Sequence, residues 1–316
     1  MKKLFRFLVI TIGVTVGVAA AAAAFVYVRG VPTYESEKSN FVHISSPASI
    51  ERGRKLSSML CANCHLDDQT GKLSGKRMLD APPEFGIANS ANITRDEEFG
   101  IGNYTDGELV VLLRTGVKRN GQYAPPYMAK LPHLSDEDMN AIISFLRSDD
   151  PWVQAVHTPA PPCEPSLLTK FLCNTAFKPL PMPKQSIASP DTSNRVELGR
   201  YLAHNLDCYA CHSGDFTKMD ILRPENSFRY FGGGNLPLNF EGKPVMTSNI
   251  TPDKETGIGL WSEDTFVRAL KYGILDGQDA LRYPMVPYVQ LSDYEAGAIY
   301  AYLMTIPPIH NSIPRN

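Results

Sequence analysis

The pentapeptide Cys-X-X-Cys-His occurs twice in the chain, as CANCH at residues 61–65 and as CYACH at residues 208–212. Two thiols on one helical turn can each bond covalently to a vinyl group of haem, and the adjacent histidine can then present its imidazole to the iron. The spacing therefore predicts two covalently bound haem c groups. The predicted haem-binding residues are Cys61, Cys64, His65, Cys208, Cys211 and His212, and the two histidines are the predicted proximal iron ligands.

Paired Cys-X-X-Cys units also occur in zinc sites, in thioredoxin-like redox centres and as structural disulfides. None of these alternatives requires a histidine directly after both pairs. The repeated histidine therefore favours haem attachment.

Length and charge limit the class of protein. A chain of 316 residues with 43% hydrophobic residues is long enough for about two packed domains. The formal net charge is −2, and no basic run follows the first few residues. We therefore do not expect nucleic acid to be a partner.

The N-terminal segment has the pattern of a membrane anchor. Lys2, Lys3 and Arg6 precede an uncharged stretch at residues 8–28, which as a helix would extend roughly 31 Å, the hydrocarbon thickness of a bilayer. A cleaved secretory signal is the alternative, although its apolar core usually runs only about 7–15 residues. In both cases the positive flank stays in the cytoplasm and the remaining chain is exported. We expect a single-pass protein of the cytoplasmic membrane with its haem domains on the periplasmic, extracytoplasmic side.

The two halves of the chain repeat each other. The segment NITRDEEFGIGNYTDGEL begins at Asn92 and NITPDKETGIGLWSEDTF begins at Asn249, an offset of 157 residues (249 − 92). A register kept over this length indicates duplication of one domain. The expected parts are an N-terminal transmembrane helix at 1–34, a first domain at 35–150, a proline-rich linker at 151–194 and a second domain at 195–316.

The linker and one insertion interrupt the repeat. Residues 151–194 hold nine of the 25 prolines, which disfavour helix and sheet interiors. Cys163 and Cys173 lie there, and we expect a disulfide between them, with free thiols as the alternative. The second copy also has ten more residues between its haem motif and Asn249, and we expect the insertion around the loop at 231–234.

Helix signals recur within each copy. Thr105 with Glu108, and Ser292 with Glu295, have the spacing of capping boxes, and apolar residues follow at helical intervals. Ser135 with Asp138 has a similar spacing, and Ser262 marks a further helix start. No alternating strand pattern of comparable quality is present, so we expect a mainly α fold.

The sequence resembles tandem class I cytochrome c domains. The shared elements are G-R-X-L before the haem motif, a methionine in a loop rich in tyrosine and proline, and L-S-D before a closing helix. The resemblance implies two cytochrome c-type helical domains after the N-terminal helix. In this family a glycine of the first helix faces an aromatic residue of the closing helix. The matching pairs here are Gly53 with Phe145 and Gly199 with Tyr302.

The NIT segments are similar to those of the multihaem cytochrome c subunits of membrane-bound alcohol and gluconate dehydrogenases, and of related exported dihaem cytochromes. Those dehydrogenase subunits normally carry three haem motifs, whereas this chain has two.

The distal iron ligands are predicted to be Met128 and Met285. Each lies six residues before the leucine of L-S-D in a proline-stiffened loop, and His/Met ligation raises the reduction potential of haem. Core packing is the ordinary alternative for a methionine. Val286 separates Met285 from Pro287, which makes Met246 the reserve candidate for the second haem, and His133 is the reserve for the first.

These features predict electron transfer without catalysis by the chain itself. The expected redox partners are a membrane dehydrogenase, a quinol-oxidising complex or a terminal oxidase. Two alternatives remain open. One is a dihaem peroxidase, which needs an iron with an open or displaceable distal position. The other is an electron-transfer subunit that works only within a larger dehydrogenase.

Overall fold

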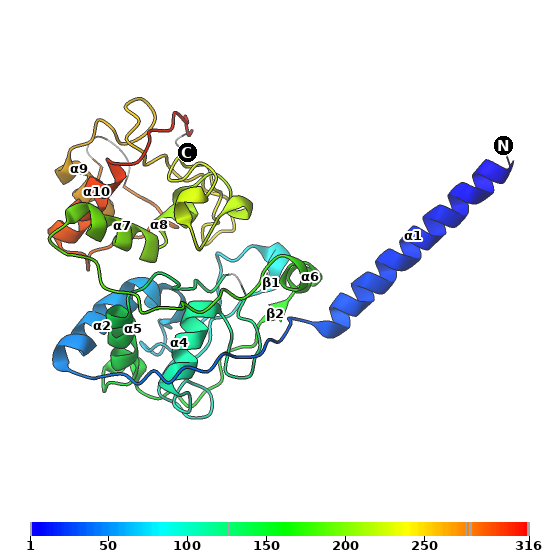
Figure 1. Ribbon diagram of the computed structural model, residues 1–316, viewed down its shortest axis with the longest axis horizontal. Coiled ribbons are helices and arrows are strands. Elements are labelled where there is room, and N and C mark those ends of the chain that lie inside the picture. The colour runs from blue at the N-terminus through cyan, green and yellow to red at the C-terminus, as the bar shows by residue number, and fades with distance from the viewer. Residues whose placement is uncertain (1, 126, 276, 278–279, 315–316) are drawn as a thin grey trace.

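In the computed structural model two helical units follow a long N-terminal helix (Figure 1). The structure describes residues 2–125, 127–275, 277 and 280–314, so the outer limits of the expected first and last segments, residues 1 and 316, lie outside the described residues. The only ladder among the described residues is a short antiparallel pair, in which β1 (Gly86–Ile87) aligns Gly86 with Pro165 of β2 (Glu164–Pro165). The prediction of a mainly α fold is confirmed.

The first unit is built from four helices. They are α2 (Pro47–Leu60), α3 (Ala62–His65), α4 (Asp106–Thr115) and α5 (Asp136–Leu146). Thr105 and Glu108 form the predicted capping box at the start of α4. Ser135 caps α5 by accepting a hydrogen bond from the amide of Asp138. The Asp138 carboxylate does not complete a capping box, because it is bonded to Arg52 and Tyr201.

The second unit repeats this order. Its helices are α7 (Arg195–Asn205), α8 (Cys208–His212), α9 (Glu263–Tyr272) and α10 (Asp293–Leu303). Ser262 caps α9, and Ser292 with Glu295 forms the predicted capping box of α10. The described residues also form four short 3₁₀ segments: η1 (Pro83–Phe85), η2 (Pro151–Val153), η3 (Phe216–Lys218) and η4 (Pro224–Asn226).

Each unit is organised by two helices that cross at a glycine. A Cβ atom added at Gly53 of α2 would overlap the carbonyl oxygen of Ala141 in α5 and would crowd Phe145. A Cβ atom at Gly199 of α7 would overlap Ala298 in the same way and crowd Tyr302. The predicted glycine–aromatic pairs are therefore in contact, and these crossings bring the backbones close enough to leave no room for a side chain.

The segment at 151–194 is more ordered than its prolines predict. It contains β2 and a helix, α6 (Leu167–Thr175), which begins at the capping residue Ser166. Residues 166–178 contain no proline, so the sequence permits this helix. Farther along, the amide of Leu180 donates to the carbonyl of Thr115, so the segment packs on the first unit.

The expected disulfide is absent. Cys163 and Cys173 are both free thiols. Cys163 is exposed and its thiol donates to the carbonyl of Asn89, whereas Cys173 is fully buried on the inner side of α6. The prediction of a disulfide is wrong, because the Cys163 thiol bonds to the backbone of Asn89, whereas Cys173 is buried within α6.

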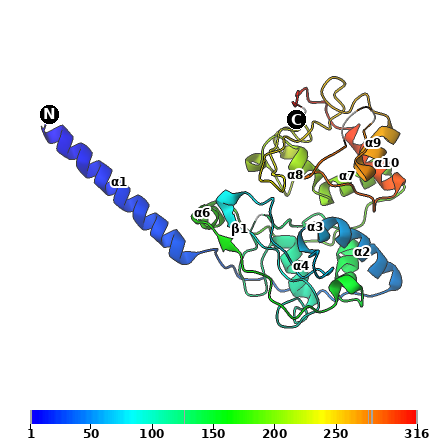
Figure 2. The same ribbon diagram turned by 180° about the vertical axis from the view of Figure 1, so that it is seen from behind.

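The N-terminal helix α1 (Lys2–Arg29) extends away from both units, as Figures 1 and 2 show from opposite sides. Its apolar stretch has the length and composition of a membrane span, and almost all of it is exposed. This finding indicates membrane anchoring or export.

The helix crossing gives a direct stability test. We expect Gly53→Ala to lower the free energy of unfolding by about 3 kcal/mol, because the new methyl group has to displace the backbone of α5. Urea unfolding followed by circular dichroism measures this change. Gly13→Ala is the matched control, since that helical glycine has open space around it. Equal stability of the two variants would contradict a tight crossing.

Candidate functional site

Both predicted proximal histidines are held by a backbone carbonyl. His65 Nδ1 lies 2.8 Å from the oxygen of Ala91, and His212 Nδ1 lies 2.8 Å from the oxygen of Ser248. Ala91 and Ser248 correspond at the repeat offset of 157 residues (248 − 91). A hydrogen bond at Nδ1 orients the ring and leaves Nε2 available as a metal ligand.

The protonation states at the two motifs suit a haem site. Burial lowers the pKa of His65 and of His212, which favours the neutral imidazole that binds a metal. Burial raises the pKa of Cys61 and Cys64 to about 11 and that of Cys208 and Cys211 to about 12. A redox-active Cys-X-X-Cys pair needs a lowered thiol pKa, so the structure disfavours the thioredoxin-like alternative.

The zinc alternative gains no support from the geometry. Within the described part of the chain, no three side chains of histidine, cysteine, aspartate or glutamate converge into a metal-binding group. The four motif cysteines lie in different units: Cys61 between α2 and α3 and Cys64 in α3 of the first, and Cys208 and Cys211 in α8 of the second.

A glycine supports each proximal histidine from its backbone side. Gly75 N donates to the carbonyl of His65 at 2.9 Å, and Gly233 N donates to the carbonyl of His212 at 2.6 Å. Both glycines have positive φ. A Cβ atom at Gly75 would overlap Ser90 and crowd Ala91, the residue that orients His65. Gly75 lies in no predicted motif. The position of Gly233 places the insertion of the second copy within residues 213–232, before this supporting glycine.

Asn92 and Asn249 fix the segments that carry the two carbonyls. Asn92 Nδ2 donates to the oxygens of Val156 and Thr158, while its Oδ1 accepts from the amide and hydroxyl of Thr94. Asn249 makes the corresponding bonds to Ile309 and Thr251. Both amides are used inside the protein, which explains why the NIT sequence is repeated.

The two predicted distal methionines occupy the same place in equivalent loops. Met128 N donates to Pro125 O at 3.1 Å, and Met285 N donates to Arg282 O at 3.1 Å. Three residues later, Leu131 N bonds to Leu113 O, and Tyr288 N bonds to Leu270 O. Each of these pairs corresponds at the offset of 157 residues, so Val286 does not change the register of the loop.

The Met285 loop faces the second motif, because Tyr288 of this loop lies near Cys208 and Cys211. The reserve candidates lie elsewhere. Met246 is two residues from Ser248, the residue that holds the far side of the His212 ring. His133 Nε2 bonds to Ile221 O of the second unit at 2.8 Å, which makes it an interdomain contact.

The first loop also contains a buried lysine. Lys130 Nζ donates to the carbonyls of Ala124 and Pro125, and burial lowers its pKa to about 7. These two bonds close the turn that carries Met128.

Comparison with known families identifies the first of these units. A family model for cytochrome c matches residues 50–149, which include the first motif and Met128. Residues 50–149 form a cytochrome c domain. Covalently bound haem c is therefore the expected cofactor, and the neutral, oriented His65 beside its two cysteines fits that group.

Relatives of the chain include subunits of larger enzymes. The cytochrome c subunit of a quinone alcohol dehydrogenase from Gluconobacter oxydans (strain 621H) is 30% identical, over 72% of this chain and 48% of the relative. The fructose dehydrogenase cytochrome subunit of Gluconobacter japonicus is 29% identical, over 82% of this chain and 53% of the relative. The chain thus spans about half the length of these subunits.

Another relative matches nearly end to end. A dihaem c-type cytochrome from Cereibacter sphaeroides is 29% identical to this chain, over 95% of this chain and 98% of the relative.

The loop that carries Met285 contacts the first unit. Tyr283, two residues before Met285, donates from its hydroxyl to Asp80 Oδ2 at 2.5 Å. The Tyr283 hydroxyl also lies near Asn63, the residue between Cys61 and Cys64, and near Cys64 itself. The loop that carries Met285 therefore contacts the first unit beside its haem motif.

Further contacts hold the two units together. The Tyr201 hydroxyl of α7 donates to Asp138 Oδ2 of α5 at 2.6 Å, and Lys55 of α2 bonds to both carboxylate oxygens of Glu295 in α10. Met59 and Leu60 pack against the cores of both units. These polar and apolar contacts fix one unit against the other.

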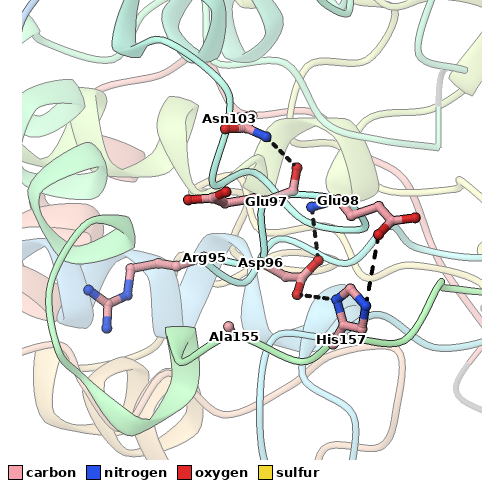
Figure 3. Close-up of a pocket in the computed structure, with 7 residues that line it drawn as sticks. All are labelled: Arg95, Asp96, Glu97, Glu98, Asn103, Ala155 and His157. Atoms are coloured by element: carbon pink, nitrogen blue, oxygen red, sulfur yellow. Dashed lines mark hydrogen bonds and ion pairs between the residues drawn. The ribbon is translucent and has the colours of Figure 1, made fainter.

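A surface hollow on the first unit contains none of the predicted haem residues. Figure 3 shows it lined by Arg95, Asp96, Glu97, Glu98, Asn103, Ala155 and His157. His157 Nδ1 lies 3.0 Å from Asp96 Oδ2, and in the second unit His310 lies near Asp253 in the same manner. The repeat offset did not predict this pair, because its two histidines are 153 residues apart (310 − 157) and not 157.

The glycine behind His65 gives a second test. Gly75→Ala and Gly71→Ala each place alanine at positive φ, at a cost of about 1 kcal/mol. Only Gly75→Ala also clashes with residues 90–91, and we expect about 2 kcal/mol of additional destabilisation. Urea unfolding monitored by haem absorbance and by circular dichroism compares the two variants. Equal losses would show that Gly75 does not support the His65 carbonyl segment.

Proposed function

We propose that the chain is an exported, membrane-anchored dihaem cytochrome c that relays electrons between redox partners. The observation that carries the proposal is the repeated site, in which His65 and His212 bond to equivalent carbonyls and Met128 and Met285 occupy equivalent turns. Bound haem c supplies a one-electron ferric/ferrous couple. The chain contributes two proximal histidines, two distal thioethers and a fixed spacing between the sites.

The four cysteines have the role of covalent attachment. Cys61 and Cys64 would hold one haem, and Cys208 and Cys211 the other. The near end-to-end similarity to a dihaem c-type cytochrome supports the number two.

The relay is supported by the contact between the units. Tyr283 joins the Met285 loop to the first motif, and the Lys55–Glu295 and Tyr201–Asp138 contacts keep this spacing. A relay needs such a fixed short path, and it needs no open site for substrate. We therefore assign electron transfer to the chain.

The membrane arrangement follows from charge. Lys2, Lys3 and Arg6 would remain on the cytoplasmic side, α1 would cross once, and both haem domains would lie on the periplasmic side. A membrane-bound dehydrogenase is the donor that the named relatives suggest. The acceptor would be a quinol-oxidising complex or a terminal oxidase.

Redox titration of the holoprotein tests the ligand assignment. We expect Met128→Ala and Met285→Ala each to remove the weak thioether-to-ferric-iron absorption of one haem. Each should also lower the potential of that haem by on the order of 100 mV, because the thioether ligand raises it. The spectrum and the midpoint potentials are the measurements.

Two other methionines provide controls. Met182 packs partly buried against the first core, and Met246 is the reserve ligand of the second haem. Substituting either with alanine should leave both potentials unchanged. A response to Met246→Ala in place of Met285→Ala would reassign the second ligand. High-spin ferric haem with peroxide turnover in the wild type would replace the relay with the peroxidase alternative.

A further inference from the structure

Helix α6 presents three different faces. Thr169 and Cys173 are fully buried, and the Thr169 hydroxyl donates to Phe85 O of the first unit at 2.8 Å. On the opposite face, the apolar side chains are exposed: Leu167 by 46%, Leu168 by 43% and Phe171 by 50%. At 100° per residue, positions 167, 168 and 171 fall on one side of a helix, so these residues form a continuous apolar face.

The third face of α6 contacts the end of α1. Asn174 Nδ2 donates to Gly30 O at 2.9 Å, and Lys170 Nζ lies 4.6 Å from the centre of the Tyr27 ring. Figures 1 and 2 both show α6 beside the end of α1 that joins the haem-bearing part of the chain. The contact therefore involves the last residues of the apolar span.

This position corresponds to a defined depth in a bilayer. The uncharged stretch of α1 ends at Val28 and Arg29 follows, so Tyr27 and Gly30 mark the boundary between acyl chains and headgroups. A helix bonded to these two residues lies in the same layer. Amphipathic helices bind there, with their apolar face buried about 5–10 Å into the boundary and with lysines near the headgroups. Two lysines lie at this level: Lys170 over the Tyr27 ring, and Lys178, which follows the helix and donates to the carbonyl of Asn174.

We infer that α6 is an interfacial membrane helix whose apolar face, formed by Leu167, Leu168 and Phe171, lies in the lipid headgroup and acyl boundary beside α1. This inference rests on the proposed anchoring by α1. A single spanning helix lets the attached units turn about its axis. A second contact, fixed to the first unit through Thr169 and Cys173, gives the haem units one orientation relative to the membrane.

Lipid photo-crosslinking tests the inference on the full-length holoprotein. The protein is reconstituted in vesicles of phosphatidylethanolamine and phosphatidylglycerol that contain a lipid with a diazirine near the top of its acyl chain. Peptide mass spectrometry then measures labelling of α1, of α6 and of residues 35–46. We expect label on α1 and on α6, and none on residues 35–46.

Matched variants test the apolar face. Leu167→Gln combined with Phe171→Gln should reduce the labelling of α6 about tenfold, because two large apolar side chains are lost, and should leave the labelling of α1 unchanged. Val42→Gln combined with Ile44→Gln is the control, since these two apolar residues are at least as exposed and lie in the segment before α2. The control should leave labelling of both helices at the wild-type level.

The outcomes separate the inference from the anchor. Label on α1 without label on α6 would overturn the inference and would leave the apolar face to a protein partner, while the anchor would stand. Label on α6 that does not respond to the glutamine variant would also overturn the inference. Absence of label from both helices would overturn the proposed anchoring, and with it the role of α6.

Discussion

The close crossing of two helices at a glycine is the constraint on which each unit depends. Gly53 lets α2 approach the backbone of α5, and α2 leads directly into the first haem motif. Gly199 does the same for α7, α10 and the second motif. The crossing therefore sets where each CXXCH segment begins, and the two carbonyls, of Ala91 and Ser248, then set the direction of its histidine. Helix packing therefore determines the position of each motif, and one hydrogen bond determines the orientation of its histidine ring.

Local and repeated patterns made much of this predictable. The capping residues Thr105 and Ser292, the glycine–aromatic pairs and the helical character of both units follow from residues close in sequence or from one constant offset. Two contacts that involve histidines were not predictable in this way: the one that holds the backbone of His65, and the pairing of His157 with Asp96. Gly75 packs against residues 90–91. His157 lies 61 residues after Asp96 in the sequence and reaches it only because the chain folds back beside the NIT loop. Such contacts arise from tertiary folding, which no local pattern encodes.

Contacts between the units make the duplication more than two copies of one domain. Tyr283 reaches from the second distal loop to Asp80 and Asn63 beside the first cysteines, and Tyr201 reaches from α7 to Asp138. The corresponding residue of Tyr283 in the first unit is outside the described residues, at position 126 (283 − 157). These side-chain contacts tie the two candidate haem sites into one arrangement.

The most direct test of the account is the number of covalently bound haems in the exported chain. Intact mass under denaturing conditions, with the pyridine haemochrome spectrum, measures this number for the wild type and for Cys61→Ala/Cys64→Ala and Cys208→Ala/Cys211→Ala variants. The account predicts two haems on the wild type and one on each double variant, at the remaining motif. A wild-type chain with one haem or none, or one whose haem persists when its motif is removed, would contradict it.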